Sequence, residues 1–284
     1  MSSPLNPSPS TGLPRLMAFD LDGTLLDPAG NITQRSVNAL LAAHATGVRI
    51  VLATGRPPFM MHQLVDAIGP ALTHGVLANG AIVCTFPDAE PLRTLHFEFN
   101  SADEIITRLR VVDPSLGFAL ATDRGFAAEP GFLERMPSPT NMPVTPDVLV
   151  ASEGAAVVVK LFVFHPTADA HELMVQLAPH VNDGFEVFHM GAEAVEIGAA
   201  GIDKASGLQW LCAHLGIEAH EVMAFGDNTN DHSMLVWVGR SVAMGNSSPA
   251  TQALATDVAL SNADDGVAVF IEQLLEAHRR RVDA

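Results

Sequence analysis

Short apolar strands alternate with helices at the start of this chain, and the alternation limits the folds that the chain can adopt. Residues 15–20 (RLMAFD), 48–55 (VRIVLATG) and 75–83 (GVLANGAIV) have the apolar runs of buried strands. Between them, residues 33–47 and 57–69 have a helical pattern that ends in glycine. Strands that are apolar on both faces and are connected by helices form a parallel sheet covered on both sides. The sequence therefore predicts a Rossmann-like, doubly wound α/β fold.

The same alternation returns near the C-terminal end. Helices are expected at residues 203–216, 230–238, 249–256 and 266–280, and strands at 221–227, 240–246 and 257–261. Residues 85–195 contain strands and helices of their own, enough for a small separate α/β sheet. We therefore expect a core made of residues 15–84 and 196–284, with an α/β domain inserted at 85–195. Residues 1–14, rich in proline and serine, are expected to form a disordered tail.

The composition excludes several classes of partner. A formal net charge of −17 repels nucleic acids and anionic membrane surfaces, so any anion site must supply its own positive charge. No apolar run approaches the length of a membrane span, and the N-terminal residues lack the pattern of a signal peptide. The two cysteines, Cys84 and Cys212, indicate free thiols in a reducing cytoplasm. No interface pattern is visible, and we expect a monomer or a weak homo-oligomer.

Two carboxylates follow the first apolar strand directly. If the extended backbone continues through Leu21, Asp20 and Asp22 project to the same side of the strand's carboxyl end, where open parallel sheets bind ligands. Two neighbouring carboxylates repel each other unless a cation lies between them or one of them is protonated. The pair alone is equally compatible with an Asp-rich turn after a strand.

Three other segments place polar side chains at strand ends or helix starts. Residues 54–56 (Thr-Gly-Arg) follow the second strand and could form an anion cradle or an ordinary helix cap. Lys204 lies at a helix start, where its charge is unfavourable unless an anion is near; a solvated surface lysine is the alternative. Asp227 and Asp231 follow a late strand and offer the oxygen ligands that Mg²⁺ prefers, although a capped surface loop has the same pattern.

Four motifs in this order resemble those of the haloacid dehalogenase superfamily. They are DLDGTLL, ATGR, GIDKASGL and GDNTNDHSML, and the similarity is greatest to the Cof-type branch of phosphatases, subclass IIB. LANGAIV and the segment AMGNSSPATQALATDVALSNADDGVA also resemble that branch. The resemblance covers residues 15–280, and it implies that the inserted domain is an α/β cap that closes over the site and selects the leaving group.

The resemblance implies a role for each motif. Asp20 would be the nucleophile that attacks phosphorus and forms an aspartyl-phosphate. Asp22 would protonate the leaving alcohol and then activate water as a general base. Thr54 and Lys204 would bind the phosphoryl group during its transfer.

The resemblance also implies a Mg²⁺ cofactor. The ion would be held by the carboxylate of Asp20, the backbone carbonyl of Asp22 and the carboxylate of Asp227, with Asp231 orienting either a metal-bound water or Lys204. The further candidates for phosphate or substrate contacts are Leu21, Gly55, Arg56, Asn79, Gly80 and Asn230.

The activity implied is hydrolysis of a small phosphorylated metabolite, such as a sugar phosphate. Two alternatives remain: a phosphomutase of the same superfamily, and a non-catalytic regulatory protein on this scaffold. His232 stands where the branch more usually has an apolar residue, which favours a role in packing or in starting a helix. For Lys160, in a strand of the inserted domain, a solvated or salt-bridged side chain is favoured.

Overall fold

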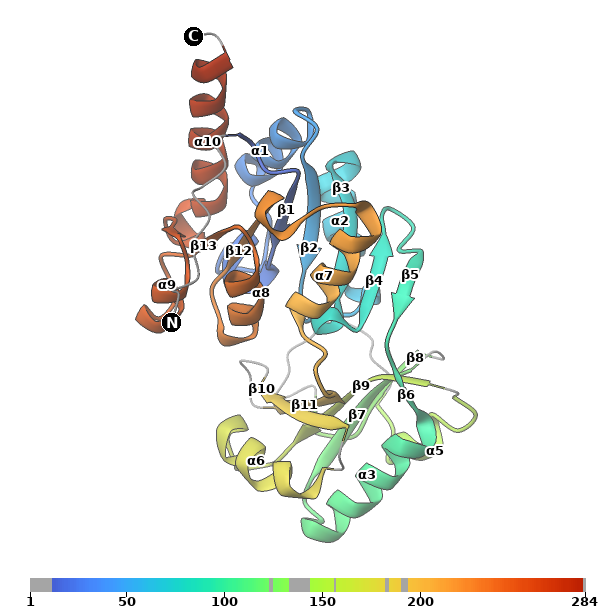
Figure 1. The fold of residues 1–284 in the computed structure, drawn as a ribbon. Helices are drawn as coiled ribbons and strands as arrows, with labels where there is room; N and C mark the ends of the chain where they lie inside the picture. The colour runs from blue at the N-terminus through green and yellow to red at the C-terminus, as the bar shows by residue number, and fades with distance from the viewer. Residues whose placement is uncertain are drawn as a thin grey trace, which may run out of the picture. The chain divides into compact units, whose positions relative to one another are not determined.

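The chain divides into two compact units. The computed structural model describes residues 12–122, 125–132, 144–155, 157–181, 184–189 and 194–282. The core unit comprises Met1–Thr94 and Asp203–Ala284, and the inserted unit comprises Leu95–Ile202 (Figure 1). Most of the expected N-terminal tail, residues 1–11, lies outside the described residues.

The core unit contains an eight-stranded sheet in the order β14-β13-β12-β1-β2-β3-β4-β5. The strands from β14 to β3 are parallel, and β4 and β5 continue the sheet antiparallel. Their bounds are β1 (Leu16–Phe19), β2 (Arg49–Ala53), β3 (Leu72–Leu77), β4 (Ile82–Thr85), β5 (Pro91–Thr94), β12 (Val222–Gly226), β13 (Arg240–Ala243) and β14 (Asp257–Val258).

Helices pack on both faces of this sheet, because the strands are apolar on both sides. They are α1 (Gln34–His44), α2 (His62–Ile68), α7 (Lys204–Leu215), α8 (His232–Trp237), α9 (Pro249–Leu254) and α10 (Gly266–Val282). On one face, Leu16 of β1 lies in a buried cluster with Leu208 of α7 and Met234 of α8. On the other face, Phe19 stacks on Phe225 at 4.8 Å, and Phe225 meets Phe270 of α10 edge-on. The predicted doubly wound α/β fold is confirmed.

Three details differ from the sequence prediction. The helix expected over residues 57–69 begins only at His62, because Pro58–Met60 form a separate 3₁₀ turn. The first boundary of the inserted unit falls after Thr94 and not after residue 84, because β5 pairs with β4 and extends the core sheet. The second falls after Ile202 and not after residue 195, because β11 (Ala194–Ala199) pairs with strands of the inserted sheet.

The inserted unit has an antiparallel sheet in the order β10-β11-β9-β7-β8, with β6 also pairing with β9. Its elements are β6 (Phe97–Glu98), α3 (Phe99–Val112), β7 (Gly117–Thr122), β8 (Gly125–Ala128), α5 (Val148–Ala151), β9 (Val157–Phe164), α6 (Ala170–Leu177), β10 (Phe185–His189) and β11. Helices α3 and α6 pack on one face through a continuous apolar cluster (Figure 1). Lys160 of β9 is fully buried and lies 2.5 Å from Glu196 of β11, so the salt-bridged alternative holds for this lysine.

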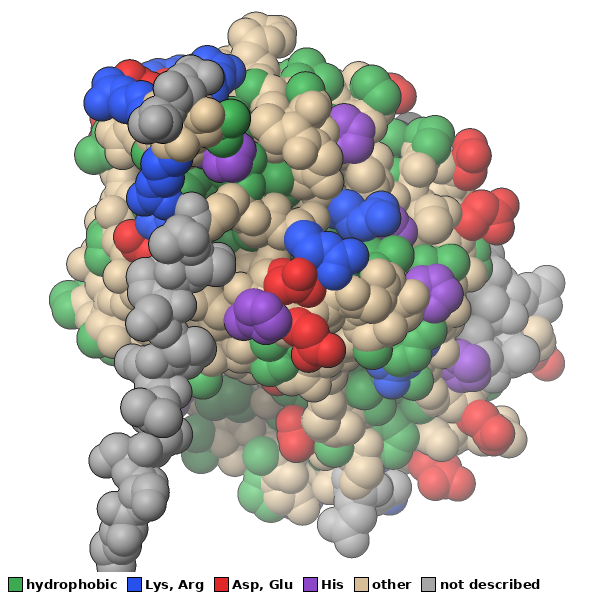
Figure 2. All heavy atoms as spheres, turned by 45° about the horizontal axis from the view of Figure 1, so that its top comes forward, with side chains coloured by type: hydrophobic (Ala, Val, Ile, Leu, Met, Phe, Trp, Pro, Cys, Tyr) green, Lys and Arg blue, Asp and Glu red, His purple; other side chains and the backbone are tan. Residues whose placement is uncertain are grey.

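The surface carries charges of both signs. Figure 2 shows acidic side chains spread over the face that it draws, with Lys or Arg side chains beside some of them. None of the helices within the described ranges has both the length and the apolar composition that crossing a membrane requires.

Candidate active site

The carboxyl ends of four parallel strands deliver the predicted site residues to one edge of the core sheet. Asp20 follows β1, Thr54 follows β2, and Asp227 follows β12, and these three strands are neighbours in the order β12-β1-β2. The next strand, β3, runs into the turn Ala78–Gly80. Because parallel strands end at the same edge, residues far apart in the sequence converge there.

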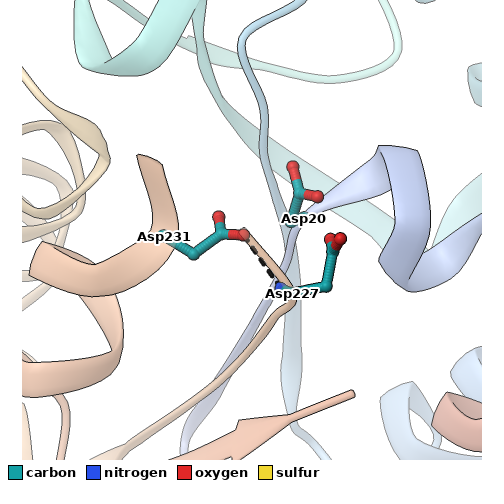
Figure 3. A group of neighbouring side chains, drawn as sticks. All are labelled: Asp20, Asp227 and Asp231. Carbon is teal, nitrogen blue, oxygen red and sulfur yellow. Dashed lines mark hydrogen bonds between the residues drawn. The ribbon is translucent and has the colours of Figure 1, made fainter. Parts of the chain in front are cut away.

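Lys204 links two of the acidic side chains. Its ammonium nitrogen, Nζ, donates to Oδ1 of Asp20 and to Oδ1 of Asp231, each at 2.6 Å. Lys204 and Asp231 have no exposed surface, and Asp20 is 5% exposed. The other oxygen of Asp231, Oδ2, accepts hydrogen bonds from the backbone N–H groups of Asp227 at 3.0 Å and Asn228 at 3.1 Å (Figure 3). Asp231 thus positions Lys204 and the loop that carries Asp227.

Asp20, Asp227 and Asp231 form a three-carboxylate cluster that could hold a metal ion. One oxygen from each residue lies within 4.8 Å of the others, and Figure 3 shows the carboxylates of Asp20 and Asp227 side by side. Three carboxylates against the one ammonium of Lys204 leave a formal excess of two negative charges. Oxygen-only ligands of this charge match a hard divalent cation such as Mg²⁺. The residues present therefore fit the ion that the resemblance implies.

The protonation equilibria of the cluster reflect its burial. Burial raises the pKa of Asp20 well above its ordinary value, and the charge of Asp231 raises it further, while Lys204 lowers it. Burial also raises the pKa of Asp227, against the opposing effect of a hydrogen bond from Thr24. For Lys204, burial lowers the pKa, but the attraction of Asp20 and Asp231 outweighs burial and leaves the pKa raised. Lys204 is therefore a permanent cation, and the ionised carboxylates need a further positive charge.

Two close backbone approaches place Lys204. The helix α7 starts with a capping box in which Asp203 accepts from the Ser206 N–H at 2.7 Å and the Ser206 hydroxyl accepts from the Asp203 N–H. The turn Ala78–Gly80, which follows β3, packs directly against the start of α7: a Cβ on Gly80 would lie 2.0 Å from the Asp203 carbonyl oxygen. A Cβ on Gly207 would lie 2.8 Å from the Cα of Gly80. Gly80, a candidate substrate contact, is thus buried against α7.

Asp22 does not join the carboxylate cluster, because the extended backbone that was assumed to continue through Leu21 does not do so. The backbone leaves the strand after Asp20 and forms a wide turn, Leu21–Leu25, in which the Leu26 N–H donates to the Leu21 carbonyl. Within it Gly23 has φ +85°, and a Cβ there would lie 2.4 Å from a carboxylate oxygen of Asp227. The turn directs Asp22 outward, where its side chain is 60% exposed and accepts two hydrogen bonds from the Arg56 guanidinium.

Thr24 is a site residue that sequence reasoning missed. Its hydroxyl donates to Oδ1 of Asp227 at 2.8 Å, and its side chain is buried. This hydrogen bond favours the ionised form of Asp227 and fixes its orientation. Only the threonine in the DGT sequence could have pointed to this contact, because the contact depends on the wide turn after β1.

The remaining candidate contacts lie in three touching loops. Thr54 is buried; its hydroxyl accepts from the Arg56 N–H at 3.1 Å, and its carbonyl accepts from the Asn79 N–H at 3.0 Å. The side-chain amide of Asn230 donates to the Asn79 side chain at 3.4 Å, and a Cβ on Gly55 would lie 3.2 Å from the same Asn79 oxygen. The loops after β2, β3 and β12 are therefore in contact with one another.

Two other side chains have packing roles. Leu21 is fully buried in the core, so only its backbone could meet a ligand. His232 begins α8, and its Nε2 lies 2.9 Å from the hydroxyl of the buried Thr251 in α9. This contact joins two helix starts.

Comparison with known proteins identifies the class to which this fold and site belong. The sequence model of the haloacid dehalogenase-like hydrolases matches residues 17–271. The pyridoxal phosphate phosphatase YbhA of Escherichia coli is 30% identical over an alignment of 268 positions, which covers 90% of this chain and 97% of YbhA. The HMP-PP phosphatase of Cronobacter sakazakii is 29% identical over an alignment of 252 positions, which covers 83% of this chain and 85% of that protein.

A solved phosphatase of the same superfamily has the same fold. BT1666 from Bacteroides thetaiotaomicron superposes with a TM-score of 0.79 over 96% of this chain and 99% of its own, at 26% identity. This chain belongs to the haloacid dehalogenase-like hydrolase family. The membership predicted from the four motifs, in the Cof-type branch, is therefore confirmed, as is the enzyme class of a phosphatase.

Proposed function

We propose that the protein is a Mg²⁺-dependent phosphatase that hydrolyses a small phosphorylated metabolite through an aspartyl-phosphate on Asp20. The observation that carries the proposal is the position of Lys204, whose buried ammonium lies 2.6 Å from Asp20 in a cluster with Asp227 and Asp231. A nucleophilic carboxylate must approach an anionic phosphate, and phosphoryl transfer depends mainly on positioning and on neutralising that repulsion.

Each half of the reaction has a group to perform it. A carboxylate oxygen of Asp20 forms a bond to phosphorus while the bond from phosphorus to the leaving oxygen breaks, and Asp22 gives that oxygen its proton. Asp22 then takes a proton from the water that attacks the aspartyl-phosphate, which releases inorganic phosphate and restores Asp20. Because Arg56 binds the Asp22 carboxylate, this role requires Asp22 to exchange Arg56 for the proton and the leaving oxygen.

Asp20, Asp227 and the backbone carbonyl of Asp22 would hold the Mg²⁺, with Asp231 beside them. When bound, the ion supplies positive charge to the phosphate oxygens and to the carboxylate cluster. Lys204 holds the Asp20 side chain in place, and the buried Thr54 lies at the end of the neighbouring strand to bind the phosphoryl group. Leu21, through its backbone, and Gly55, Arg56, Asn79, Gly80 and Asn230 remain candidate substrate contacts.

The proposed substrates are phosphate monoesters of small metabolites, such as sugar phosphates or phosphorylated cofactors. The relatives support a small phosphorylated compound as the substrate, since one is named for pyridoxal phosphate and another for HMP-PP. We propose that the inserted unit acts as the cap that selects among them. The proposed setting is the reducing cytoplasm, where the buried thiols of Cys84 and Cys212 stay reduced, with the protein acting as a monomer or weak homo-oligomer.

The test is release of inorganic phosphate from p-nitrophenyl phosphate and from a panel of phosphorylated metabolites, with Mg²⁺ and after complete chelation. We expect release only with the metal, and a loss of about 10³-fold or more in kcat for Asp20→Asn. Activity that survives chelation, or that survives Asp20→Asn, would overturn the proposal. Isomerisation of a sugar phosphate with little phosphate release would identify a mutase instead.

A further inference from the structure

Two asparagines from the C-terminal part of the chain bind the wide turn that follows the candidate nucleophile. The side-chain amide of Asn246 donates to the carbonyl of Gly23 at 2.8 Å. The side-chain amide of Asn262 donates to the carbonyl of Leu26, also at 2.8 Å. The two asparagines are joined, because the Asn262 N–H donates to Oδ1 of Asn246 at 3.0 Å. We call these residues the asparagine clamp.

The clamp binds two carbonyls that do not accept the hydrogen bonds within the turn. Within the turn, the N–H groups of Leu25 and Leu26 donate to the carbonyls of Asp20 and Leu21. Those two bonds connect the start of the turn to its end. The clamp adds two further bonds, to the carbonyl of Gly23 inside the turn and to the carbonyl of Leu26 directly after it. The turn therefore depends both on its own bonds and on two side chains from the C-terminal part of the chain.

The clamp is itself held rigidly. Asn246 follows β13, and the Met244 N–H donates to the Gly226 carbonyl, next to Asp227, at 3.0 Å. The Gly245 N–H donates to the Leu260 carbonyl, and a Cβ on Gly245 would lie 2.9 Å from the Ser261 nitrogen. Because the backbone at Gly245 approaches residues 260–261 so closely, the backbone next to Asn246 has little freedom to move.

The peptide that Asn246 binds lies between two residues of the proposed chemistry. Gly23 directly follows Asp22, the proposed general acid, and directly precedes Thr24, which donates to Asp227. The other side of Gly23 is fixed, since the Asp227 carboxylate occupies the space of a Cβ. A shift of the Gly23 carbonyl would move Asp22 and Thr24 together.

We propose that Asn246 and Asn262 are positioning residues of the enzyme, which set the location of Asp22 through the Gly23 and Leu26 carbonyls. This inference rests on the proposed function. It does not make either asparagine a catalytic residue, since each acts through the turn. A displacement of about 1 Å in a catalytic group can cost about 100-fold in rate, which is the scale on which the clamp acts.

The test uses the dependence on the leaving group, which a loss of stability alone does not change. Phenolate needs a proton to leave, whereas p-nitrophenolate is a much weaker base and leaves without one. A misplaced Asp22 therefore slows phenyl phosphate more than p-nitrophenyl phosphate. Asp22→Asn calibrates the effect, since a general acid contributes about 10²- to 10⁴-fold.

The central variant is Asn246→Asp, which keeps the shape and the oxygen that accepts from Asn262 but replaces the donor to Gly23 with a repelling oxygen. We expect kcat/KM, which reports formation of the aspartyl-phosphate and not its later hydrolysis, to fall about 10- to 100-fold for phenyl phosphate and less than about 3-fold for p-nitrophenyl phosphate. Asn262→Asp and Asn246→Ala are expected to show the same selectivity. The matched control is Asn38→Asp on α1, where an exposed asparagine accepts a hydrogen bond from Gln34 and both rates should stay unchanged.

Each outcome decides between the two proposals. If Asp22→Asn is selective for phenyl phosphate and the asparagine variants are not, the clamp is overturned and the proposed function stands. Equal losses of kcat/KM with both substrates, together with a lowered melting temperature, overturn the clamp in the same way, because they indicate a structural role only. If Asp22→Asn itself lacks selectivity, the acid role of Asp22 fails and the clamp fails with it.

Discussion

The ammonium nitrogen of Lys204 lies 2.6 Å from Oδ1 of Asp20, and this contact joins the start of α7 to the end of β1. Both groups are buried, so the Lys204 ammonium depends on Asp20 and Asp231 together for the stabilisation that water would otherwise provide. Since Asp227 and Asp231 add two more carboxylates near this one cation, the cluster has a formal excess of two negative charges.

Lys160 and Lys204 are the only lysines in the chain, and neither has exposed surface. We expect an amine-reactive succinimidyl ester to leave both unmodified in the native protein, because neither is accessible and the raised pKa of Lys204 keeps its amine protonated. Mass spectrometry of proteolytic peptides provides the measurement. The same reagent applied to protein unfolded in urea is the control and should modify both. Rapid labelling of Lys204 in the native protein would show that its pair with Asp20 opens.

Asp20→Asn is expected to stabilise the metal-free protein while abolishing activity. The pKa of Asp20 is raised in the folded state, mainly by burial, so the folded protein holds this proton more tightly than the unfolded chain does. The contribution of Asp20 to the free energy of unfolding is therefore fully present at pH values below its ordinary pKa of 3.8. It is lost as the pH rises through the raised pKa that Asp20 has in the folded protein. An asparagine is neutral at every pH, so the variant does not lose stability in this way.

The measurement is the melting temperature of both proteins in chelator from pH 4 to pH 8. We expect the variant to melt higher near neutral pH, by a few degrees (about 2–4 °C for each kcal/mol), and the difference to shrink toward pH 4. Mg²⁺ should raise the melting temperature of the native protein more than that of the variant. A variant that melts lower than the native protein at pH 7 would contradict this account of Asp20.

The sequence was sufficient to predict the strand ends that carry Asp20, Thr54 and Asp227, because an apolar run and its last residue are visible locally. Lys204 could be placed in the same way, since Asp203 and Ser206 mark the helix start on which it lies. The edge of the sheet then brings these residues together without further information.

The position of Asp22 could not be predicted in this way, because it depends on a contact between distant segments. The backbone turns at Gly23 where the carboxylate of Asp227 fills the space of a side chain, and nothing near residue 23 indicates that neighbour. The bond from Thr24 to Asp227 and the bond from Asn246 to Gly23 require the same turn. The first boundary of the inserted unit also depended on a pairing, that of β5 with β4.

Thr24→Val is expected to weaken metal binding more than it weakens the fold. The change removes the hydroxyl that donates to Asp227 at 2.8 Å and keeps the shape of the buried side chain. Loss of a hydrogen bond to a metal ligand typically costs about 10- to 100-fold in metal affinity. The Mg²⁺ concentration that gives half-maximal phosphatase activity should therefore rise by about that factor.

Thr24→Ser should restore most of the affinity, since it keeps the hydroxyl. Thr46→Val is the matched control, since the Thr46 hydroxyl donates to a backbone carbonyl at the end of α1, and it should leave the Mg²⁺ dependence unchanged. Equal Mg²⁺ dependence in Thr24→Val and the native enzyme would exclude Asp227 as a ligand held by Thr24.

Gly80→Ala and Gly30→Ala separate backbone strain from the close approach that places Lys204. Both glycines have positive φ, +98° and +81°, so each substitution carries a backbone cost of about 1–2 kcal/mol. A Cβ at Gly30 meets nothing within 4 Å, but one at Gly80 would lie 2.0 Å from the Asp203 carbonyl oxygen. We expect Gly80→Ala to lower the free energy of unfolding, measured in urea, by about 2 kcal/mol or more beyond the loss in Gly30→Ala.

Because the clash pushes the start of α7 away, Gly80→Ala should also lower kcat about 10-fold or more, while Gly30→Ala should not. Equal stabilities and equal rates in the two variants would show that the contact between Gly80 and Asp203 does not hold Lys204 in place.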